Sequence, residues 1–293
     1  MEYKISDLED LDAITKLVTA RNNMEEHYIA YCCKQREHIY KDFQTMLCEE
    51  ENRVVTAWKE GELYGVLGLF CINEIRRVDS VGPFVDCNEG EEDVFLEVAK
   101  NMLEVAKKEY NNFSFSFNIN SKNELCLKLM KMLGNVEANG EQELMLKCEN
   151  YISKVENRTV IAYTKEYEER VKELHDVIAK DYYLTSNELI KSNGDTIELY
   201  IILDEEEVVA YGALRFSEHT DATVWIEIIG VKEQHRGKGY GKMILDELLY
   251  QAFQRIGVYE VKLNVDDINR TALSLYSSFG FVCVIHTYSF MMK

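Results

Sequence analysis

The last third of the chain alternates between apolar and polar positions in a way that predicts a strand, a loop and a helix in succession. The run from 224 to 231, VWIEIIGV, is apolar enough for a buried strand. The stretch from 258 to 265 alternates like a half-buried strand, and 269 to 281 continues with an amphipathic helix. Between these segments, apolar side chains recur at helical spacing: Ile244, Leu245, Leu248, Ala252 and Ile256.

The loop between the first strand and the first helix, 236 to 242, reads RGKGYGK. Glycines let the backbone turn without a Cβ clash, and the free N–H groups and dipole of a helix N-terminus favour an anion. A P-loop would need Gly-Lys-Ser/Thr, and a dinucleotide fingerprint would need G-x-G-x-x-G, whereas the spacing here is G-x-G-x-G. The plainer alternative is a glycine-rich turn with a solvated basic edge.

A third phosphate-loop pattern, R-x-x-G-x-G, fits at Arg236, Gly239 and Gly241. It resembles the acyl-CoA pyrophosphate loop of the GNAT (GCN5-related N-acetyltransferase) superfamily. The later stretch resembles the closing motif of the same superfamily, N-x-x-A-x-x-L-Y-x-x-x-G-F, at Asn269, Ala272, Leu275, Tyr276, Gly280 and Phe281. The resemblance covers about residues 157 to 293 and implies acetyl-CoA as the co-substrate.

The resemblance also implies which residues hold the cofactor. The strand before the loop is expected to splay from the strand at 258 to 265 and to offer its backbone to the pantetheine arm, while Asn269 contacts that arm and Tyr276 points at the thioester sulfur. The cofactor-binding residues expected from the strand and the loop are Ile229, Gly230, Val231, Arg236, Gly237, Lys238, Gly239, Tyr240, Gly241 and Lys242.

Direct acyl transfer to an amine poses two proton problems. An alkylamine is almost wholly protonated at pH 7, so a base must take its proton, and the leaving thiolate must be protonated. Tyrosine is protonated at pH 7 and can donate, so Tyr276 is the candidate acid, with an ordinary core tyrosine as the alternative. Glu227 is the candidate base, with a salt-bridged or solvent-facing glutamate as the alternative.

Weaker candidates surround this pair. Glu218 and His219, in the turn before the strand, are candidates for substrate contact, and His286 is a weaker one. Cys283 is expected to be a small core residue. The acceptor site is expected to be formed by 166 to 192 together with whatever the amino-terminal half contributes.

The amino-terminal half repeats the same plan with an offset of 146 residues. Asn123, Cys126, Leu129, Met130 and Gly134 correspond to residues of the closing motif. Met130 stands where Tyr276 would be, and a thioether cannot donate a proton. The stretch corresponding to the phosphate loop carries four carboxylates that would repel a pyrophosphate: Glu89, Glu91, Glu92 and Asp93.

These patterns predict an α/β chain of two tandem GNAT-like domains, each with a central mixed, mainly antiparallel sheet flanked by helices. The expected domains are 1–150, lacking CoA motifs, and 151–293, carrying the catalytic site. A loose match between any two α/β segments is the alternative to a true duplication.

Composition narrows the partners. The 293 residues suffice for two domains, and a net charge of −19 argues against nucleic acid and is compatible with a cationic substrate. The chain shows neither a run of about 18 apolar residues nor a signal-peptide start. Its eight cysteines lack a C-x-x-C pair. We therefore expect a cytoplasmic monomer or homodimer with no metal and no membrane partner.

The sequence therefore predicts an acetyl-CoA-dependent N-acetyltransferase acting on a primary amine, either a small molecule or a peptide. The alternative is a non-enzymatic acyl-CoA sensor, against which the retained Tyr276 argues, because binding alone needs no proton donor. The identity of the acceptor and the length of the acyl group are not encoded in these motifs.

Overall fold

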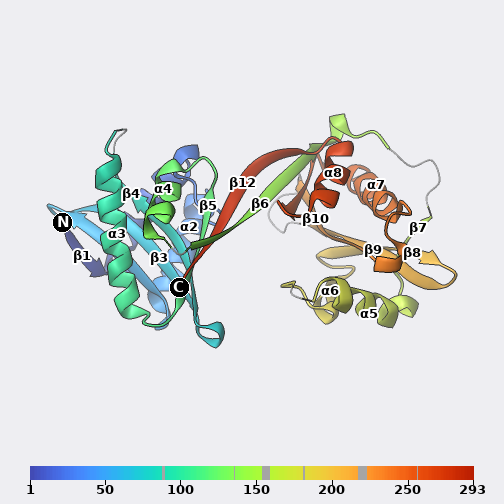
Figure 1. The fold of residues 1–293 in the computed structure, drawn as a ribbon, viewed down its shortest axis with the longest axis horizontal. Helices are drawn as coiled ribbons and strands as arrows, with labels where there is room; N and C mark the ends of the chain where they lie inside the picture. Colours follow the sequence, from blue (N-terminus) through green and yellow to red (C-terminus); the bar gives the residue numbers. More distant parts are fainter. Residues whose placement is uncertain (88–89, 135, 154–158, 181, 217–222, 256) are drawn as a thin grey trace. The chain divides into compact units, whose positions relative to one another are not determined.

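The computed structural model describes residues 1–87, 90–134, 136–153, 159–180, 182–216, 223–255 and 257–293. It divides the chain into two compact units (Figure 1). Unit 1 comprises residues 1–141 together with 285–293, and unit 2 comprises residues 142–284.

Unit 1 is a mixed sheet in the order β1-β2-β3-β4-β5-β12 with helices on both faces. The two glycines of its third strand let the helices approach closely, since a Cβ on Gly65 would meet Met102 of α3 and one on Gly68 would meet Phe43 of α2. Its elements are β1 (Glu2–Ile5), α1 (Leu11–Asn22), α2 (Arg36–Cys48), β2 (Arg53–Lys59), β3 (Glu62–Ile72), β4 (Arg77–Val85), α3 (Glu92–Glu109), β5 (Ser114–Asn120) and α4 (Glu124–Leu133).

Unit 2 has the same architecture, with the strand order β6-β11-β10-β9-β8-β7. Ile256, which the helical pattern included, lies outside the described residues. The elements are β7 (Val160–Ala162), α5 (Glu168–Ile178), α6 (Ser186–Ser192), β8 (Ile197–Asp204), β9 (Glu207–Phe216), β10 (Thr223–Val231), α7 (Tyr240–Phe253), β11 (Glu260–Asp266) and α8 (Arg270–Ser278).

The predicted repeat is present in the structure. Both units run in the order strand, two helices, three strands, helix, strand, helix. A parallel pairing in each unit begins at the same place in the repeat, at Arg77↔Ser114 between β4 and β5 and at Thr223↔Glu260 between β10 and β11. Each residue of the second pair lies 146 positions after its counterpart, so the sequence offset is also a structural register.

The last strand of each repeat continues into the other unit. β6 (Val136–Lys147) begins in unit 1, but its residues from Gln142 onward belong to unit 2. β12 (Val282–Met292) begins in unit 2, but its residues from Ile285 onward belong to unit 1, where it pairs antiparallel with β5. Leu144 and Leu146 of β6 lie in a unit 2 core, whereas Met292 lies in the unit 1 core.

The units therefore differ from the contiguous domains 1–150 and 151–293 expected from the sequence. The reason is physical: an alternating strand pattern fixes which side chains face a core, but not which sheet edge accepts the strand. Residues just after the expected boundary at 150 are packed in unit 2. The Tyr151 hydroxyl lies 3.1 Å from a carboxylate oxygen of Asp246 in α7, and the Ser153 hydroxyl donates to the other oxygen at 2.8 Å.

The sheet of unit 2 separates two helical layers (Figure 1). α7 and α8 cover one face with a large apolar cluster, and α5 covers the other with a smaller one. Gly212 of β9 is required for the first layer, because a Cβ there would lie 2.4 Å from Ile244 and 2.9 Å from Leu248 of α7. This close approach fixes α7, and with it the loop at its N-terminus, against the sheet.

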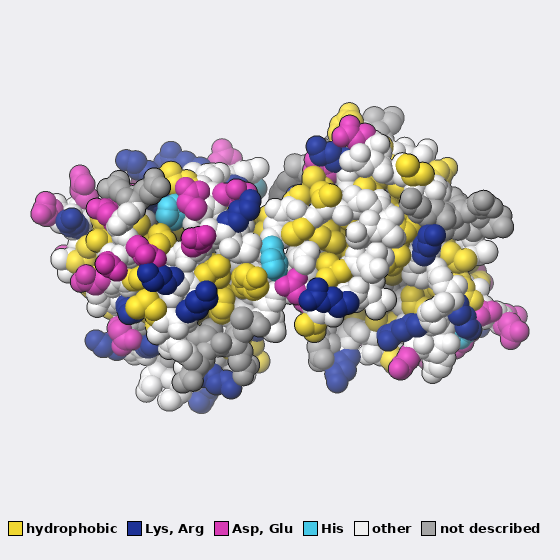
Figure 2. All heavy atoms as spheres, turned by 45° about the horizontal axis from the view of Figure 1, so that its top comes forward, with side chains coloured by type: hydrophobic (Ala, Val, Ile, Leu, Met, Phe, Trp, Pro, Cys, Tyr) yellow, Lys and Arg dark blue, Asp and Glu magenta, His cyan; other side chains and the backbone are white. Residues whose placement is uncertain are grey.

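Charged side chains of both signs are interspersed over the face shown in Figure 2. None of the eight cysteines forms a disulfide. Cys283 is exposed on β12, so the expectation that it belongs to the core is wrong; its strand leaves the unit 2 sheet just after this position. None of the helices in the described ranges is both long and apolar enough to span a membrane.

Candidate functional site

The glycine loop turns directly from the end of β10 into α7. Gly237 and Gly239 have φ values of +77° and +89°, a region that other residues rarely adopt, and a Cβ on either would meet open space. Gly239 caps α7 without a side-chain hydrogen bond, so the first N–H groups of the helix remain available to a ligand. The loop is exposed, and Lys238 and Lys242 are exposed beside it.

Basic and acidic groups fix the two ends of this loop. The Arg236 Nε donates to the Val231 carbonyl at 3.3 Å, which folds the arginine back along the strand end. The Tyr240 hydroxyl donates to Asp204 at 3.0 Å, and this hydrogen bond raises the pKa of Tyr240. Lys238 lies 3.4 Å from a ring nitrogen of His235.

β10 and β11 pair only at their beginnings. Their parallel register ends at Trp225↔Lys262, whereas β10 remains paired with β9 as far as Val231↔Ala210. Ile229, Gly230 and Val231 are therefore free of β11 on one side. The sequence expectation that the two strands part is confirmed, and the unpaired edge offers backbone groups of the kind that a pantetheine amide binds.

α8 closes the same region from the second motif. The Asn269 side chain accepts the Ala272 N–H at 3.1 Å, as Asn123 does for Cys126 in the first repeat. Tyr276 is buried in the cluster that includes Ile229 and Val231, and burial raises the pKa of Tyr276 to about 12.

Glu227 lies on the other face of the sheet, where the β9–β10 register shifts between Ile226 and Ile228. Its side chain is only 2 % exposed and is ion-paired with Arg215, whose Nε donates to Oε2 at 2.5 Å. The Tyr182 hydroxyl donates to Oε1 at 2.8 Å, and the Tyr183 hydroxyl also donates to Oε1. Burial first, and then the nearby carboxylate, raise the pKa of Tyr183 to about 12. The alternative of a salt-bridged glutamate thus describes its geometry correctly.

A buried histidine holds the segment that carries these two tyrosines. His175 of α5 is 1 % exposed, and its Nε2 lies 2.8 Å from the Leu184 carbonyl. Its Nδ1 lies 2.8 Å from the Tyr211 hydroxyl of β9. Because a carbonyl oxygen only accepts, Nε2 is the donor to Leu184, and the other ring nitrogen makes the hydrogen bond with the Tyr211 hydroxyl. The segment between α5 and α6 is thereby tied to the sheet on which Glu227 lies.

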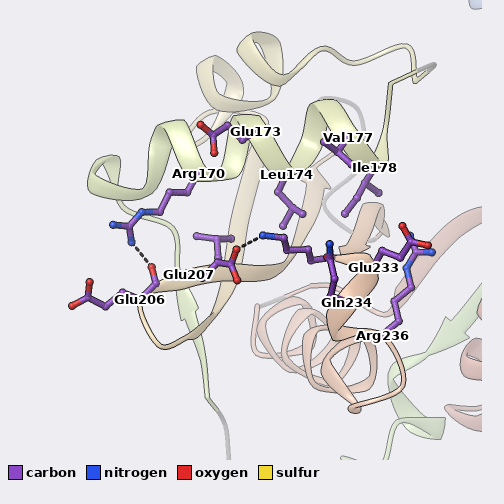
Figure 3. Close-up of a pocket in the computed structure, with 12 residues that line it drawn as sticks. Arg170, Glu173, Leu174, Val177, Ile178, Glu206, Glu207, Glu233, Gln234 and Arg236 are labelled. Atoms are coloured by element: carbon purple, nitrogen blue, oxygen red, sulfur yellow. Dashed lines mark hydrogen bonds and ion pairs between the residues drawn. The ribbon is translucent and has the colours of Figure 1, made fainter.

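A pocket of about 770 Å³ adjoins the glycine loop through Arg236 (Figure 3). α5 contributes an apolar wall, with Leu174, Val177 and Ile178 directed toward the residues that follow β10. The remaining wall is charged with both signs and is partly paired, since Lys232 bonds to Glu207. The other charged lining residues are Arg170, Glu173, Glu206 and Glu233.

The corresponding region of unit 1 has a different character. α3 begins at Glu92, which pairs with Lys128 at 2.7 Å, and Glu91 precedes it at the cap. Glu89 lies outside the described residues. Met130, in the place of Tyr276, is 1 % exposed and packs in the core. The start of α3 therefore carries carboxylates where unit 2 has a glycine loop with lysines, and the apolar Met130 stands where unit 2 has a tyrosine.

The structure brings together the loop, the strand end and α8 within one apolar cluster, since a Cβ on Gly241 would lie 3.7 Å from both Val231 and Leu275. Glu218 and His219 lie outside the described residues. His286 belongs to unit 1, where its carbonyl accepts the Ser121 N–H, and is not part of this cluster.

Sequence reasoning did not identify three of the groups around Glu227. Tyr182 and Tyr183 lie within the segment expected to form the acceptor site, and their pairing as adjacent tyrosines was the available signal. Arg215 was detectable as a cation in an otherwise apolar strand. Among the described residues, no cluster of three or more His, Cys, Asp or Glu side chains is arranged to hold a metal ion.

Residues 158–281 match the sequence profile of the acetyltransferase (GNAT) family. A curated relative, the uncharacterized N-acetyltransferase YycN of Bacillus subtilis (strain 168), is 35 % identical over 80 residues, which are 27 % of this chain and 51 % of the relative. The chain thus spans about half the length of that relative.

Solved structures share the fold over nearly the whole chain. A GCN5-related N-acetyltransferase from Sphaerobacter thermophilus has a TM-score of 0.70 at 17 % identity, over 99 % of this chain and 94 % of the other. A tandem GNAT protein from the clavulanic acid biosynthesis pathway has a TM-score of 0.60 at 11 % identity, over 99 % and 97 %. These similarities show that the chain has a tandem GNAT fold.

Proposed function

We propose that this chain, which belongs to the acetyltransferase (GNAT) family, transfers an acetyl group from acetyl-CoA to a primary amine in unit 2. Two adjacent features carry the proposal. The start of α7 at Gly239 has no side-chain cap, and the end of β10 is not paired with β11. Together they provide N–H donors for a pyrophosphate and backbone groups for the amide-bearing arm.

The residues around the loop fit the cofactor chemically. The backbone N–H groups of the first turn of α7 would hold the pyrophosphate, with Lys238 and Lys242 adding positive charge. Ile229 to Val231 would pair with the pantetheine arm, and Asn269 would donate its amide to it. When bound, acetyl-CoA supplies an activated acyl group whose carbon–sulfur bond breaks as a carbon–nitrogen bond forms.

The acceptor proton would leave toward the Glu227 cluster. The Glu227 side chain is almost fully buried, whereas Tyr183 is 69 % exposed and hydrogen-bonded to it. An amine on the open side would therefore reach the Tyr183 oxygen before the carboxylate. Tyr183 would accept the amine proton as it passes its own proton to Glu227, which leaves the phenol neutral and the carboxylate protonated.

Tyr276 would donate to the leaving thiolate. Burial raises its pKa to about 12 and so keeps the hydroxyl in the protonated form at neutral pH. Its position in the cluster with Ile229 and Val231 places it on the α7–α8 side of β10, opposite Glu227. Proton removal and proton donation would thus be assigned to different faces of the sheet.

Titration calorimetry with CoA tests the binding site. Gly239→Glu adds a side chain and a negative charge at the loop and is expected to lower the affinity by at least about tenfold. Gly194→Glu is the matched control, because Gly194 has the same φ of +89° and equally open surroundings but lies between α6 and β8. Equal loss of affinity in both variants, or in neither, would remove the loop from the site.

A further inference from the structure

Three side chains form a row across the α5 face of the unit 2 sheet. The β9–β10 register pairs Arg215 with Trp225, and the β10–β11 register pairs Trp225 with Lys262. Residues paired in register point to the same face. The row lies where β10 and β11 stop pairing and beside the buried carboxylate of Glu227, so it borders the place where acyl transfer is proposed.

Arg215 is only partly satisfied in this row. Its Nε donates to Glu227, but among the described residues none accepts a hydrogen bond from either of its Nη groups. The side chain is 41 % exposed. Lys262, in contrast, has a direct partner, since its ammonium donates to Glu143 of β6 at 2.9 Å. The Arg215 guanidinium is therefore the more exposed cation of the row, and its two Nη groups are available as a planar pair of donors.

Trp225 supplies a flat apolar surface between the two cations. The guanidinium carbon of Arg215 and the ammonium of Lys262 each lie 5.7 Å from the centre of the indole ring. These contacts hold the ring and the guanidinium in a fixed relation. A ligand on this face would therefore contact the N–H groups of the Arg215 guanidinium and, beside them, the indole ring of Trp225.

The chemistry of the fork selects its ligand. A guanidinium presents parallel N–H groups that match the two oxygens of a carboxylate, and phosphate can use the same donors. Glu227 and Glu143 both lie close by, so a dianionic phosphate would be repelled more than a singly charged carboxylate. The site therefore favours a carboxylate.

We infer that the amine acceptor also carries a carboxylate, which binds Arg215, and an apolar body, which packs on Trp225. This describes a free amino acid with an apolar side chain, and Arg215 is its specificity-determining residue. The inference rests on the proposed acetyl transfer. The ammonium first releases one proton to solvent. The neutral nitrogen then gains the acetyl group and loses a second proton to the Tyr183–Glu227 pair, while the thiolate of CoA gains a proton from Tyr276, and proton exchange with solvent restores Tyr276 and Glu227.

A thiol-release assay with matched acceptors tests the inference. The wild-type protein is given phenylalanine, phenylalaninamide and 2-phenylethylamine, which share an aromatic body and an amine but differ in the carboxylate. Phenylalanine is expected to have a kcat/KM about 10- to 100-fold higher than either analogue, the range that a charged hydrogen-bonding pair supplies.

Arg215→Lys locates the origin of this preference. Lysine keeps the charge beside Glu227 but loses the fork. Any effect through Glu227 is shared by all acceptors, so the ratio of kcat/KM for phenylalanine to kcat/KM for 2-phenylethylamine is expected to fall about tenfold or more. Arg255→Lys is the control, because Arg255 pairs with Glu198 on the α7 side of the sheet. Calorimetry with CoA on each variant verifies that the fold is intact.

The outcomes separate this inference from the proposed function. If no primary amine releases thiol, the proposed acetyl transfer fails. If amines react but the carboxylate confers no advantage, or Arg215→Lys affects all three acceptors equally, the transfer stands and the inference is overturned. Better turnover of 2-aminoethyl phosphate than of any amino acid would overturn the assignment of a carboxylate.

Discussion

Tyr276 and Glu227, the two candidate proton-transfer residues of unit 2, are both buried, but their surroundings differ. Tyr276 sits among apolar side chains that disfavour its phenolate, which raises its pKa to about 12. Glu227 is buried as a carboxylate with three donors around it. The surroundings of Tyr276 thus preserve a proton to give, whereas those of Glu227 place a hydrogen-bonded tyrosine between the carboxylate and the open side.

Replacement of Tyr276 by phenylalanine is expected to lower kcat by about 10²- to 10⁴-fold, the usual cost of losing a general acid, with CoA affinity unchanged. In the wild type, the raised pKa keeps Tyr276 protonated well above neutrality, so kcat should not fall between about pH 8 and pH 10. Tyr259→Phe, at an exposed tyrosine of the same unit, is the control. A decrease of less than about threefold would mean that another group protonates the thiolate.

Glu227→Gln and Tyr183→Phe test the acceptor side. Both are expected to lower kcat by about 10²-fold or more if the proton passes through the phenol to the carboxylate. If Glu227 acts without Tyr183, only the first variant loses activity, and single-turnover kinetics on the two variants and their double mutant will show it. Additive losses in the double mutant would contradict a relay, because groups that act in one chain are non-additive.

At the scale of elements, the segment from β10 to α7 was predictable because its signals are local. The apolar run and the helical spacing placed the strand at 224–231 and the helix after the glycine loop, and the structure has β10 at Thr223–Val231 and α7 at Tyr240–Phe253. The partners of Glu227 were not predictable in this way. Arg215 lies 12 residues away and Tyr182 lies 45, so only the sheet register and the packing of α5 bring them together.

The packing of α7 on β9 leads to a stability prediction. Gly212→Ala would place a Cβ 2.4 Å from Ile244, and such overpacking is expected to lower the free energy of unfolding by about 1–3 kcal/mol. Gly241→Ala is the control, since its Cβ would lie 3.7 Å from the nearest side chains. Urea denaturation measures both. A Gly212→Ala protein as stable as the wild type would show that α7 does not pack this closely.

At the scale of the whole molecule, β6 and β12 connect the two repeats, because each strand begins in one unit and ends in the other. Each unit is completed by the last strand of the other repeat, so neither repeat contains its whole sheet. The sequence contains the offset of 146 residues but not the exchange, because β6 and β12 have the same place and pattern in their repeats.

Removal of residues 285–293 distinguishes the exchange from contiguous domains. β12 pairs with β5 from Thr287↔Asn120 to Met292↔Phe115, so the truncation is expected to lower the hydrogen-exchange protection of β5 in unit 1 by at least about tenfold. Removal of Lys293 alone is the control. Contiguous domains would instead lose protection in β11, and that result would refute the exchange.

Amine-dependent release of CoA from acetyl-CoA tests the central claim most directly. The protein is incubated with acetyl-CoA and a panel of primary amines, amino acids included, and the free thiol and the acetylated amine are both quantified. The account predicts equal amounts of thiol and N-acetyl product in the wild type, with the rate strongly reduced by Gly239→Glu and not by Gly194→Glu. Tight binding of acetyl-CoA without transfer to any amine would contradict the account and identify unit 2 as an acyl-CoA sensor.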